Sequence, residues 1–503
     1  MTWAELHGVL RARSVIVASA SLPAEAAAPV TGIAYDSRTV APGQVFVALK
    51  GQRTDGAAFV QEAVRRGAVA VVSEDPAPGD VRTPWTTVSD ARLTLAILAA
   101  SFYRHPSDEM AVIGITGTNG KTTTAYLIAS IFDAANMPCG VLGTVAYRVA
   151  GEIREATRTT PEAPELQQLL REMVAGGSRA CAMEVSSHAL VLSRVAEITF
   201  AAGVFTNLTR DHLDFHGDMD TYFRAKRRLF EMLPQDAPSL LNIDDPRGLA
   251  LAEMAPRPVT FAIGRPADIT PGPLSFSLDG LVFDVRTPRG TLQIRSTLVG
   301  RPNVYNLLAA VATAVALDVP FDAIEHGVTA LAGVPGRFQL VSGSGDDVIV
   351  VVDYAHTDDA LKNLLETARP LARGRLITVF GCGGNRDRTK RPLMGAVAGR
   401  LSDVIIVTSD NPRGEDPLRI IEDIQRGITA DTRRDDAQRL LSFIDRREAI
   451  DRAVELARPG DLVLIAGKGH ETYQVVGDRT LPFDDVFVAR EALLRRRSNS
   501  GVV

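Results

Sequence analysis

The N-terminal part of the chain alternates short apolar runs with stretches of helical spacing. The runs predict strands at 33–38, 45–49 and 69–73, and the first helical stretch covers 57–66. This pattern predicts a small α/β unit whose strands share one sheet. A second helix, predicted over 91–103, leads to a polar break at 105–107. We place the first domain boundary at this break and assign residues 1–106 to an N-terminal domain.

A second region of alternating strands and helices follows. Its apolar runs stand at 140–143, 180–184 and 202–206. Runs that are apolar throughout indicate a mostly parallel sheet covered by helices on both faces. A strand-rich insertion over 258–298 and a helix over 304–317 come next, and the turn at 334–337 ends the region. We assign residues 107–337 to this central domain.

The last part of the chain repeats the pattern. Four apolar runs separated by helical stretches stand at 348–353, 376–381, 404–409 and 462–467. They predict a doubly wound, Rossmann-like domain over residues 338–503. Three domains also suit the length, because 503 residues exceed what one core usually holds. The predicted fold class is α/β, with a small α/β N-terminal domain, a central parallel-sheet domain and a Rossmann-like C-terminal domain.

The strand before residue 117 opens into a glycine-rich turn that covers 117–123. Gly117 and Gly120 permit backbone conformations closed to other residues, so that N–H groups can turn inward onto phosphate oxygens. We expect Lys121 on the terminal phosphates, the Thr122 hydroxyl on magnesium, and a helix that adds its positive end. The motif is a shortened variant of the usual phosphate loop. A bare strand-to-helix turn is the alternative, but lysine and threonine after two glycines would have little structural purpose.

Composition and charge narrow the class of protein. The chain has 55 Lys and Arg against 60 Asp and Glu, which gives no support for nucleic acid or an anionic membrane as the main partner. Neither a secretion signal nor an apolar run of ~18 residues is present, so we expect a cytoplasmic protein that does not insert into membranes. Cys139, Cys181 and Cys382 are too few and too dispersed for a disulfide framework or a thiolate zinc site, and we expect them to be buried apolar residues.

Several polar residues could bind a metal ion. Glu184 ends a predicted apolar strand, and Asp211 and His212 follow another. On its own, His212 is equally well explained as part of a solvated loop. Beside a phosphate loop and Glu184, a metal ligand becomes the better interpretation.

Lys226 lies in a helical stretch over 222–230. A solvated basic face is the simplest explanation of this stretch. The alternative is that the Lys226 amine, deprotonated beside metal and phosphate, captures carbon dioxide. It would then become an N-carboxylate, a hard oxygen ligand of the kind that magnesium prefers.

Three loops of the third domain carry polar residues at predicted strand ends. The turn at 380–387 lacks the third glycine of a dinucleotide motif, which removes the main support for a dehydrogenase. The segments 409–413, 390–392 and 467–471 offer guanidinium groups for a carboxylate and acidic groups for an ammonium. Together they complement a zwitterionic amino acid, although turn chemistry alone could explain Asp410, Asn411 and Pro412.

These motifs, in this order, resemble the Mur ligases of peptidoglycan synthesis over nearly the whole chain. The matching segments are 36–38, 55–56, 117–123, 159–161, 184–188, 211–212, 303–306, 335–337, 353–356 and 410–413. The resemblance implies ATP-dependent amide ligation with Mg²⁺ as cofactor. Folylpolyglutamate synthetase is a runner-up, but the motif at 36–38 in a separate domain argues against it. A nucleotide switch without synthesis would not need the convergent loops of the third domain.

The resemblance also implies site residues. For ATP they are Gly117, Thr118, Asn119, Gly120, Lys121, Thr122, Thr123, Asn303 and Arg337. For UDP-N-acetylmuramoyl-L-alanyl-D-glutamate they are Tyr35, Ser37, Gln52, Arg53, Thr54, Thr159, Thr160, Ser186, Leu192 and Arg194. For the amino acid they are Arg391, Asp410, Asn411, Pro412, Arg413, Gly467 and Glu471. The implied metal ligands are Thr122, Glu184, His212 and carbamylated Lys226, and the implied catalytic residues are Lys121, Glu184, His212 and Lys226.

The family's reaction forms an acyl phosphate on the D-glutamate γ-carboxylate, which an amino-acid amine then attacks. The run from Asp410 to Arg413 resembles the version that selects meso-diaminopimelate. Two positions depart from the family pattern: Asp358 replaces a common proline, and Leu192 replaces a polar substrate contact of some members. We expect a monomer that closes on its ligands near residues 335–337 and has no nucleic-acid partner.

Overall fold

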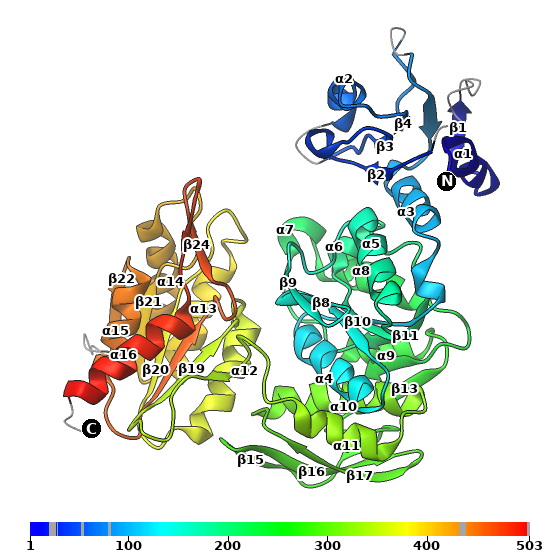
Figure 1. Ribbon diagram of the computed structural model, residues 1–503. Coiled ribbons are helices and arrows are strands. Elements are labelled where there is room, and N and C mark those ends of the chain that lie inside the picture. The colour runs from blue at the N-terminus through cyan, green and yellow to red at the C-terminus, as the bar shows by residue number, and fades with distance from the viewer. Residues whose placement is uncertain (20–26, 28, 52–54, 79–81, 432–438, 500–503) are drawn as a thin grey trace.

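Three parallel or mostly parallel sheets organise the molecule, one in each part of the chain (Figure 1). The computed structural model describes the whole chain except residues 20–26, 28, 52–54, 79–81, 432–438 and 500–503. The small N-terminal part stands above the central part, and the C-terminal part lies beside the central part. The predicted α/β class with three domains is confirmed. The boundaries after residues 106 and 337 stay predictions.

The N-terminal sheet has the order β1-β5-β4-β3-β2, with only β1 antiparallel to its neighbour. Its strands are β1 (Ile16–Ser19), β2 (Gly32–Ala34), β3 (Gln44–Val47), β4 (Ala70–Ser73) and β5 (Trp85–Val88). Its helices are α1 (Trp3–Ala12), α2 (Val60–Arg65) and α3 (Ala91–Phe102).

Two of the expected N-terminal elements are shorter than predicted. The strand expected over 33–38 ends at Ala34, because the Asp36 side chain accepts the Arg38 N–H and starts a 3₁₀ turn. The helix expected over 57–66 becomes α-helical only at Val60, after a 3₁₀ turn that begins where Asp55 accepts a backbone N–H. In both places a short acidic side chain competes with the regular backbone pattern.

The central sheet has the order β13-β12-β11-β6-β10-β7-β8-β9. Its strands are β6 (Ala111–Thr116), β7 (Cys139–Leu142), β8 (Ala146–Val149), β9 (Glu152–Glu155), β10 (Ala180–Glu184), β11 (Phe200–Phe205), β12 (Ser239–Asn242) and β13 (Pro258–Phe261). Its helices are α4 (Lys121–Ala134), α5 (Ala163–Ala175), α6 (Ser187–Val191), α7 (Leu213–His216), α8 (Met219–Glu231), α9 (Pro246–Ala252), α10 (Arg301–Ala316) and α11 (Phe321–Ala330). Separate apolar clusters fill the two faces, as a sheet covered on both sides requires.

The predicted strand-rich insertion forms a small antiparallel sheet only from Thr270 onward, packed against α10 and α11, because the first strand of the predicted range, β13, joins the central parallel sheet. Its strands are β14 (Thr270–Pro271), β15 (Ser275–Ser277), β16 (Gly280–Thr287) and β17 (Gly290–Ser296). One face of β16 and β17 is buried and the other is exposed, which explains the alternation of apolar and polar residues along both strands.

The C-terminal sheet has the order β18-β19-β23-β20-β21-β22, with only β18 antiparallel. Its strands are β18 (Gln339–Leu340), β19 (Ile349–Asp353), β20 (Leu376–Phe380), β21 (Val404–Thr408), β22 (Leu440–Phe443) and β23 (Leu462–Ala466). The helices α12 (Asp358–Ala368), α13 (Lys390–Leu401), α14 (Pro417–Asp431), α15 (Arg446–Leu456) and α16 (Asp485–Asn499) cover its two faces. A separate hairpin joins β24 (Tyr473–Val476) to β25 (Arg479–Pro482).

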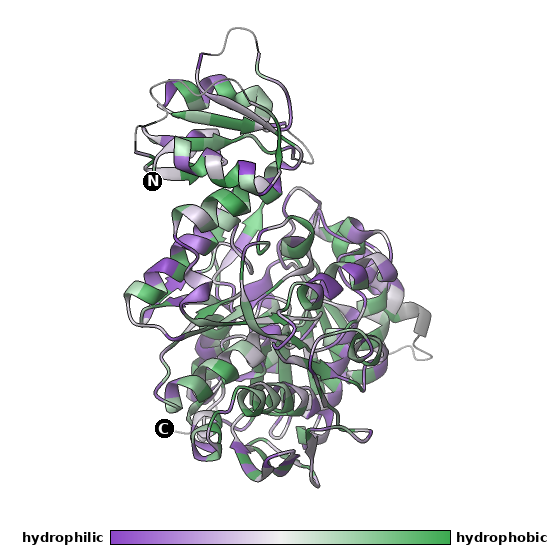
Figure 2. Ribbon diagram, turned by 90° about the vertical axis from the view of Figure 1, so that its right-hand side faces the viewer, coloured by the Kyte–Doolittle hydropathy of each residue, from purple (hydrophilic) through white to green (hydrophobic). Residues whose placement is uncertain are grey.

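Apolar residues gather along the strands of the sheets (Figure 2). Cys139, Cys181 and Cys382 are buried free thiols, as predicted. Among the described helices, none combines the length and the apolar character that crossing a bilayer requires.

Candidate functional site

The phosphate loop joins the end of β6 to the start of α4. Gly117 has φ +150° and Gly120 has φ +88°, conformations that L side chains rarely adopt. A Cβ atom at Gly117 would clash with the Thr206 hydroxyl, and one at Gly120 would clash with the Asn306 side-chain oxygen. No side chain caps α4, so its first N–H groups remain free to bind an anion.

Two lysine amines converge on one carbonyl oxygen of this loop. The Nζ of Lys121 donates to Gly117 O at 3.0 Å and to Thr118 O at 2.8 Å. The Nζ of Lys226 donates to Gly117 O at 2.7 Å. Neither amine has an ion-pair partner within the described part of the chain. The loop therefore concentrates positive charge and donors at the place where a phosphate would lie.

Lys226 is only 1 % exposed, although it lies on the polar-looking helix α8. The solvated-face explanation is therefore wrong. Burial, with a further contribution from Lys121, holds the pKa of the Lys226 amine well below its ordinary value. Burial also lowers the pKa of Lys121. A neutral amine at Lys226 is nucleophilic, which is the property that the carbon dioxide hypothesis requires.

Glu184 places a carboxylate in the same cavity, at the end of β10. It is 1 % exposed, and its two oxygens accept hydrogen bonds from the Thr144 N–H at 2.9 Å and the Thr144 hydroxyl at 3.0 Å. The Thr122 hydroxyl lines the cavity as well and accepts a hydrogen bond from Arg337 Nη2 at 3.1 Å. The cavity measures about 270 Å³.

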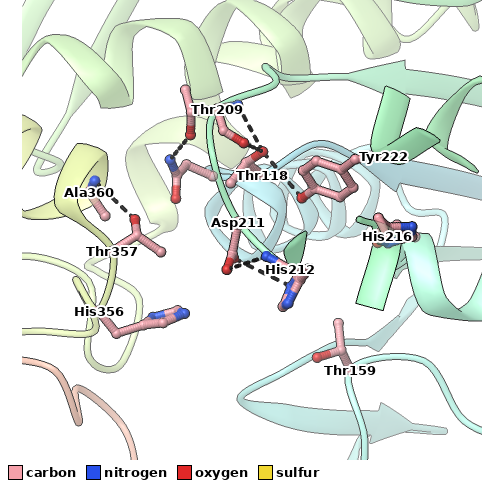
Figure 3. Close-up of polar contacts among 12 residues, drawn as sticks. Thr118, Thr159, Thr209, Asp211, His212, His216, Tyr222, His356, Thr357 and Ala360 are labelled. Carbon is pink, nitrogen blue, oxygen red and sulfur yellow. Dashed lines mark hydrogen bonds and ion pairs between the residues drawn. The ribbon is translucent and has the colours of Figure 1, made fainter. Parts of the chain in front are cut away.

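Asp211 and His212 also line this cavity (Figure 3). The Asp211 carboxylate accepts the His212 N–H at 2.8 Å and lies 3.4 Å from the ring Nε2. Burial lowers the pKa of His212, so its ring is neutral near pH 7. The His188 ring contacts it edge-on at 4.9 Å.

The donor set of this cavity suits magnesium better than zinc. Within the described residues, no group of three or more His, Cys, Asp or Glu side chains is placed to hold a metal ion. Mg²⁺ does not need such a group, because it usually takes one or two carboxylates and completes its shell with water and substrate phosphate. Glu184 and Thr122 are oxygen donors of this kind, whereas the His212 nitrogen is the least suitable of the predicted ligands.

The C-terminal part closes the cleft over the phosphate loop. Arg337, which donates to Thr122, also stacks over the Tyr354 ring at 4.6 Å. Asn119 donates to the Asp359 carboxylate at 3.0 Å. His356 faces the cleft from the same side (Figure 3).

Asn303 also lines the cleft, and its side chain bonds Val299 O and the Asn306 amide. A second cavity of about 730 Å³ shares the wall at Asn119, Gly120 and Asn306, so the cleft continues past the loop. The structure therefore groups the predicted nucleotide residues around one space.

Most residues predicted for the muramoyl dipeptide lie next to Glu184. The Thr159 and Thr144 hydroxyls are 3.0 Å apart, and Thr160 Oγ1 donates to Glu184 O at 2.8 Å and to Ser186 Oγ at 3.2 Å. Arg194 donates to Thr160 O at 3.0 Å. Leu192 is the C-cap residue of α6 and does not line the cavity.

Residues predicted for the uridine diphosphate lie in the N-terminal part. The Tyr35 hydroxyl donates to Glu165 of α5 at 2.9 Å, which ties this part to the central one. The Ser37 hydroxyl donates to Glu62 at 2.9 Å. Gln52, Arg53 and Thr54 lie outside the described residues. The predicted uridine contacts therefore stay predictions.

Two of the three C-terminal loops meet at the ends of β21 and β23. Asn411 Nδ2 donates to Glu471 Oε2 at 2.9 Å. A Cβ atom at Gly467, where φ is +116°, would come within 2.7 Å of an Asp410 carboxylate oxygen, so the two loops touch. Pro412 continues the first loop into Arg413.

Arg413 and Arg391 have different surroundings. Within the described residues, the Arg413 side chain donates only through Nη1, to Gly384 O at 3.0 Å and Asn411 O at 3.5 Å. Its Nε and Nη2 are thus available to a ligand carboxylate. Arg391 is 1 % exposed and forms ion pairs with Glu415 at 3.1 Å and Asp423 at 3.0 Å. Arg391 is thus held by two carboxylates, and its predicted contact with the amino acid stays a prediction.

Sequence reasoning missed Thr144 and Lys468. Thr144 provides both donors to Glu184 and follows the short strand β7, with no motif to mark it. The Lys468 amine is fully buried and contacts Glu471 Oε2 at 2.9 Å and Asn411 Oδ1 at 3.3 Å. Its position between two predicted site residues, Gly467 and Glu471, was the available signal.

Comparison with known proteins matches these three parts to three family models. They are described as "Mur ligase family, catalytic domain" for residues 29–103, "Mur ligase middle domain" for 115–314 and "Mur ligase, glutamate ligase domain" for 336–469.

Curated relatives match over nearly the full length. A UDP-N-acetylmuramoyl-L-alanyl-D-glutamate–2,6-diaminopimelate ligase of Solibacter usitatus is 48% identical over 94% of this chain and 95% of its own. The ligase of the same name from Geobacter metallireducens is 47% identical over 91% and 92%.

Solved structures show the same fold. A structure with that ligase name superposes with a TM-score of 0.67 at 34% identity and covers 99% of both chains. A MurF ligase of Thermotoga maritima in complex with ADP has a TM-score of 0.63 at 18% identity, covers 93% of this chain and 98% of its own, and is similar in fold.

The crowding at Gly120 leads to a prediction. Gly120→Ala should lose about 1–2 kcal/mol of unfolding free energy from left-handed backbone strain. It should also lose most of the thermal stabilisation by ATP and magnesium, because the new methyl group displaces Asn306. Gly151→Ala is the matched control, since Gly151 has φ +85° with nothing within 4 Å of its Cβ position. Urea denaturation and ligand-induced shifts in Tm measure both effects. A full ATP shift in Gly120→Ala would contradict the prediction.

Proposed function

This chain belongs to the Mur ligase family, and from that premise we propose that it joins meso-diaminopimelate to UDP-N-acetylmuramoyl-L-alanyl-D-glutamate at the expense of ATP. The observation that carries the proposal is the pairing of two subsites around one cleft. A phosphate loop contacted by the half-buried Lys121 amine and the buried Lys226 amine lies on the central side. A loop pair that offers one free guanidinium and acidic groups lies on the C-terminal side. Such a pairing suits a reaction that activates a carboxylate and then delivers an amino acid to it.

The route between the subsites is short. Glu184 is held by Thr144, and the His470 ring lies against the Thr144 backbone. Glu471, beside His470, belongs to the amino-acid loops. An amine bound at Glu471 is therefore close to the acyl group that we place at Glu184.

The first step transfers the γ-phosphoryl group of ATP to the γ-carboxylate of D-glutamate, so that ADP leaves and an acyl phosphate forms. Lys121 and the free N–H groups of α4 bind the transferring group, since both are aimed at the loop centre. Thr159, Thr160, Ser186 and Arg194 position the acceptor carboxylate. Magnesium, when bound, neutralises the phosphate charge, and Thr122, Glu184, His212 and modified Lys226 would hold it.

In the second step the deprotonated amine of diaminopimelate attacks the acyl carbon. The C–N bond forms, the bond from carbon to the phosphate oxygen breaks, and inorganic phosphate leaves together with one proton from the amine nitrogen. Arg413 and Glu471 hold the amino acid, with Asp410, Asn411 and Gly467 shaping the loops around it. Asn303 and Arg337 hold the nucleotide, and the hinge at 335–337 closes the cleft.

We propose that Lys226 acts as its carbamate. The reaction forms a bond between Nζ and the carbon of CO₂ with release of one proton, and it requires the neutral amine. Burial at 1 % exposure without an acidic partner in the described chain favours that neutral form. The product places an anionic oxygen donor beside Gly117 and the phosphates, where magnesium ligands are needed.

Each of the three predicted domains would serve one ligand. Residues 1–106 hold the uridine diphosphate, 107–337 hold ATP and 338–503 hold the amino acid. We propose that the enzyme works as a monomer in the cytoplasm, because one chain supplies every subsite and ATP is available there.

Phosphate release tests the proposed function. The purified protein is incubated with ATP, magnesium and the UDP-muramoyl dipeptide, with and without meso-diaminopimelate. Phosphate release that depends on the dipeptide and on the amino acid, together with a tripeptide product in mass spectrometry, is the expected result. Release that does not respond to either substrate would reject amide ligation.

Removal of the Lys226 amine gives the second prediction. Lys226→Ala should abolish ligation, and added formate or acetate should restore part of it by supplying the missing oxygen donor. Lys226→Arg should also be inactive, because a guanidinium cannot form the carbamate. Arg227→Ala, on the exposed side of the same helix, is the control and should remain active. An active arginine variant would show that positive charge is what this position supplies.

Amino-acid selectivity gives the third prediction. Meso-diaminopimelate carries a second carboxylate that L-lysine lacks, and Arg413 can bind it through its two free nitrogens. Arg413→Ala should cost about 2–5 kcal/mol in kcat/KM for diaminopimelate and much less for lysine. Arg388→Ala, at an exposed arginine paired with Glu415, should leave the preference intact. An unchanged ratio of the two kcat/KM values in Arg413→Ala would exclude this loop as the selective element.

A further inference from the structure

A buried arginine–aspartate pair lies behind the amino-acid loops and takes no part in the reaction described above. Arg446 begins α15, and Asp485 begins α16. Their side chains are 0% exposed. Arg446 Nε donates to Asp485 Oδ1 at 2.8 Å, and Nη2 donates to Oδ2 at 2.7 Å, so the ion pair is bidentate.

The same guanidinium also reaches two backbone carbonyls. Its Nη2 donates to Ala466 O at 3.0 Å, and its Nη1 donates to Ser409 O at 3.3 Å. Ala466 is the last residue of β23, and Ser409 follows the last residue of β21. The next residues in the chain are Gly467 and Asp410, where the two amino-acid loops begin. One side chain therefore holds the backbone at the start of both loops.

The two strands need such a link because they are not neighbours. β20 lies between β21 and β23 in the sheet, so no backbone hydrogen bond joins them directly. Yet the loops that follow make close contacts, including the hydrogen bond between Asn411 and Glu471 at 2.9 Å. A small shift of one strand end against the other would break this bond and move the Glu471 carboxylate.

Stability alone is a weak reason to bury such a pair. Desolvation of two charges offsets most of their attraction, and an apolar pair of similar volume is often as stable. What apolar side chains cannot supply is a pair of donors to two separated carbonyls. The guanidinium, with its five N–H groups in a rigid plane, satisfies the carboxylate and both carbonyls at once.

We propose that Arg446, held in place by Asp485, is a positioning residue for the amino-acid subsite. It sets the separation of the loops that begin at Asp410 and Gly467, and through them the place of Glu471. The inference rests on the proposed function for the identity of the amino acid. The link that Arg446 makes between the starts of the two loops does not depend on which amino acid binds.

The chain offers a comparison pair at the opposite edge of the same sheet, where β20 and β23 begin. Arg375 precedes β20 and Asp461 precedes β23, and their side chains form an ion pair at 2.7 Å. Arg375 also donates to a backbone carbonyl, that of Leu456 at 2.8 Å. This pair has the same chemistry on the same sheet but lies far along the strands from the loops.

The test compares three variants with the wild type. The first combines Arg446→Met with Asp485→Leu, which leaves no buried charge unpaired and so keeps the fold. The second is Arg375→Met, and the third is Arg446→Lys. Steady-state kinetics give KM for meso-diaminopimelate, KM for ATP and kcat, thermal denaturation gives Tm, and crystal structures give the distance between Asn411 Nδ2 and Glu471 Oε2.

The paired variant should raise KM for diaminopimelate by about tenfold to a hundredfold, with KM for ATP and kcat nearly unchanged. Its crystal structure should show the Asn411–Glu471 hydrogen bond broken. Arg375→Met should change neither. Arg446→Lys, which keeps the charge but not the two extra donors, should resemble the paired variant.

A paired variant with wild-type KM and an intact Asn411–Glu471 bond would overturn the proposal. So would equal losses for ATP and diaminopimelate, which would indicate a general structural role. Wild-type protein that fails to use diaminopimelate would refute the proposed function instead. In that case the crystallographic distance still decides whether Arg446 positions the loops.

Discussion

The site depends on two lysine amines that share the carbonyl oxygen of Gly117, one of them, Lys226, buried. An enclosed ammonium without an acidic partner in the described chain is costly in free energy. The cost falls when an anion binds beside the ammonium or when the amine loses its proton. The Lys121 amine is placed to bind a phosphate, whereas the Lys226 amine is buried more deeply and favours its neutral form. Binding of an anion would therefore stabilise this loop, and the carboxylates and the cleft lie around it.

Strand ends supply the other groups because backbone positions there are well defined while the side chains reach solvent or ligand. Glu184 ends β10, Thr206 follows β11, and Asp410 lies just beyond β21. Open α/β sheets bind ligands at these carboxyl ends. Two such sheets, turned toward one cleft, place a phosphate site and an amino-acid site within reach of each other.

Much of this arrangement was predictable from local sequence. The strand at 180–184 matches its predicted bounds, and the loop at 117–123 has the predicted strand before it and helix after it. Local pattern fails where a partner far along the chain decides the outcome. The local pattern around Lys226 suggests a surface lysine, but α8 packs this side chain against a loop more than a hundred residues away in the chain. The ion pairs of Arg391 with Glu415 and Asp423 likewise join residues far apart in the chain, and its role as a ligand contact stays a prediction. Side-chain direction at such positions is a property of the tertiary fold.

Polar contacts join the two sides of the cleft. Arg337 bonds Thr122, Asn119 bonds Asp359, and Arg210 lies 3.5 Å from the Asp387 carboxylate. Polar interfaces of this type let domains move relative to each other. Ligation requires such domain motion. The cleft first excludes water from the acyl phosphate, and it must then open so that ADP and the ligated product can leave. Because Arg337 lies in the segment 335–337 where we propose the hinge and also bonds Thr122 at the start of α4, the proposed closure would act through a side chain that contacts the phosphate loop.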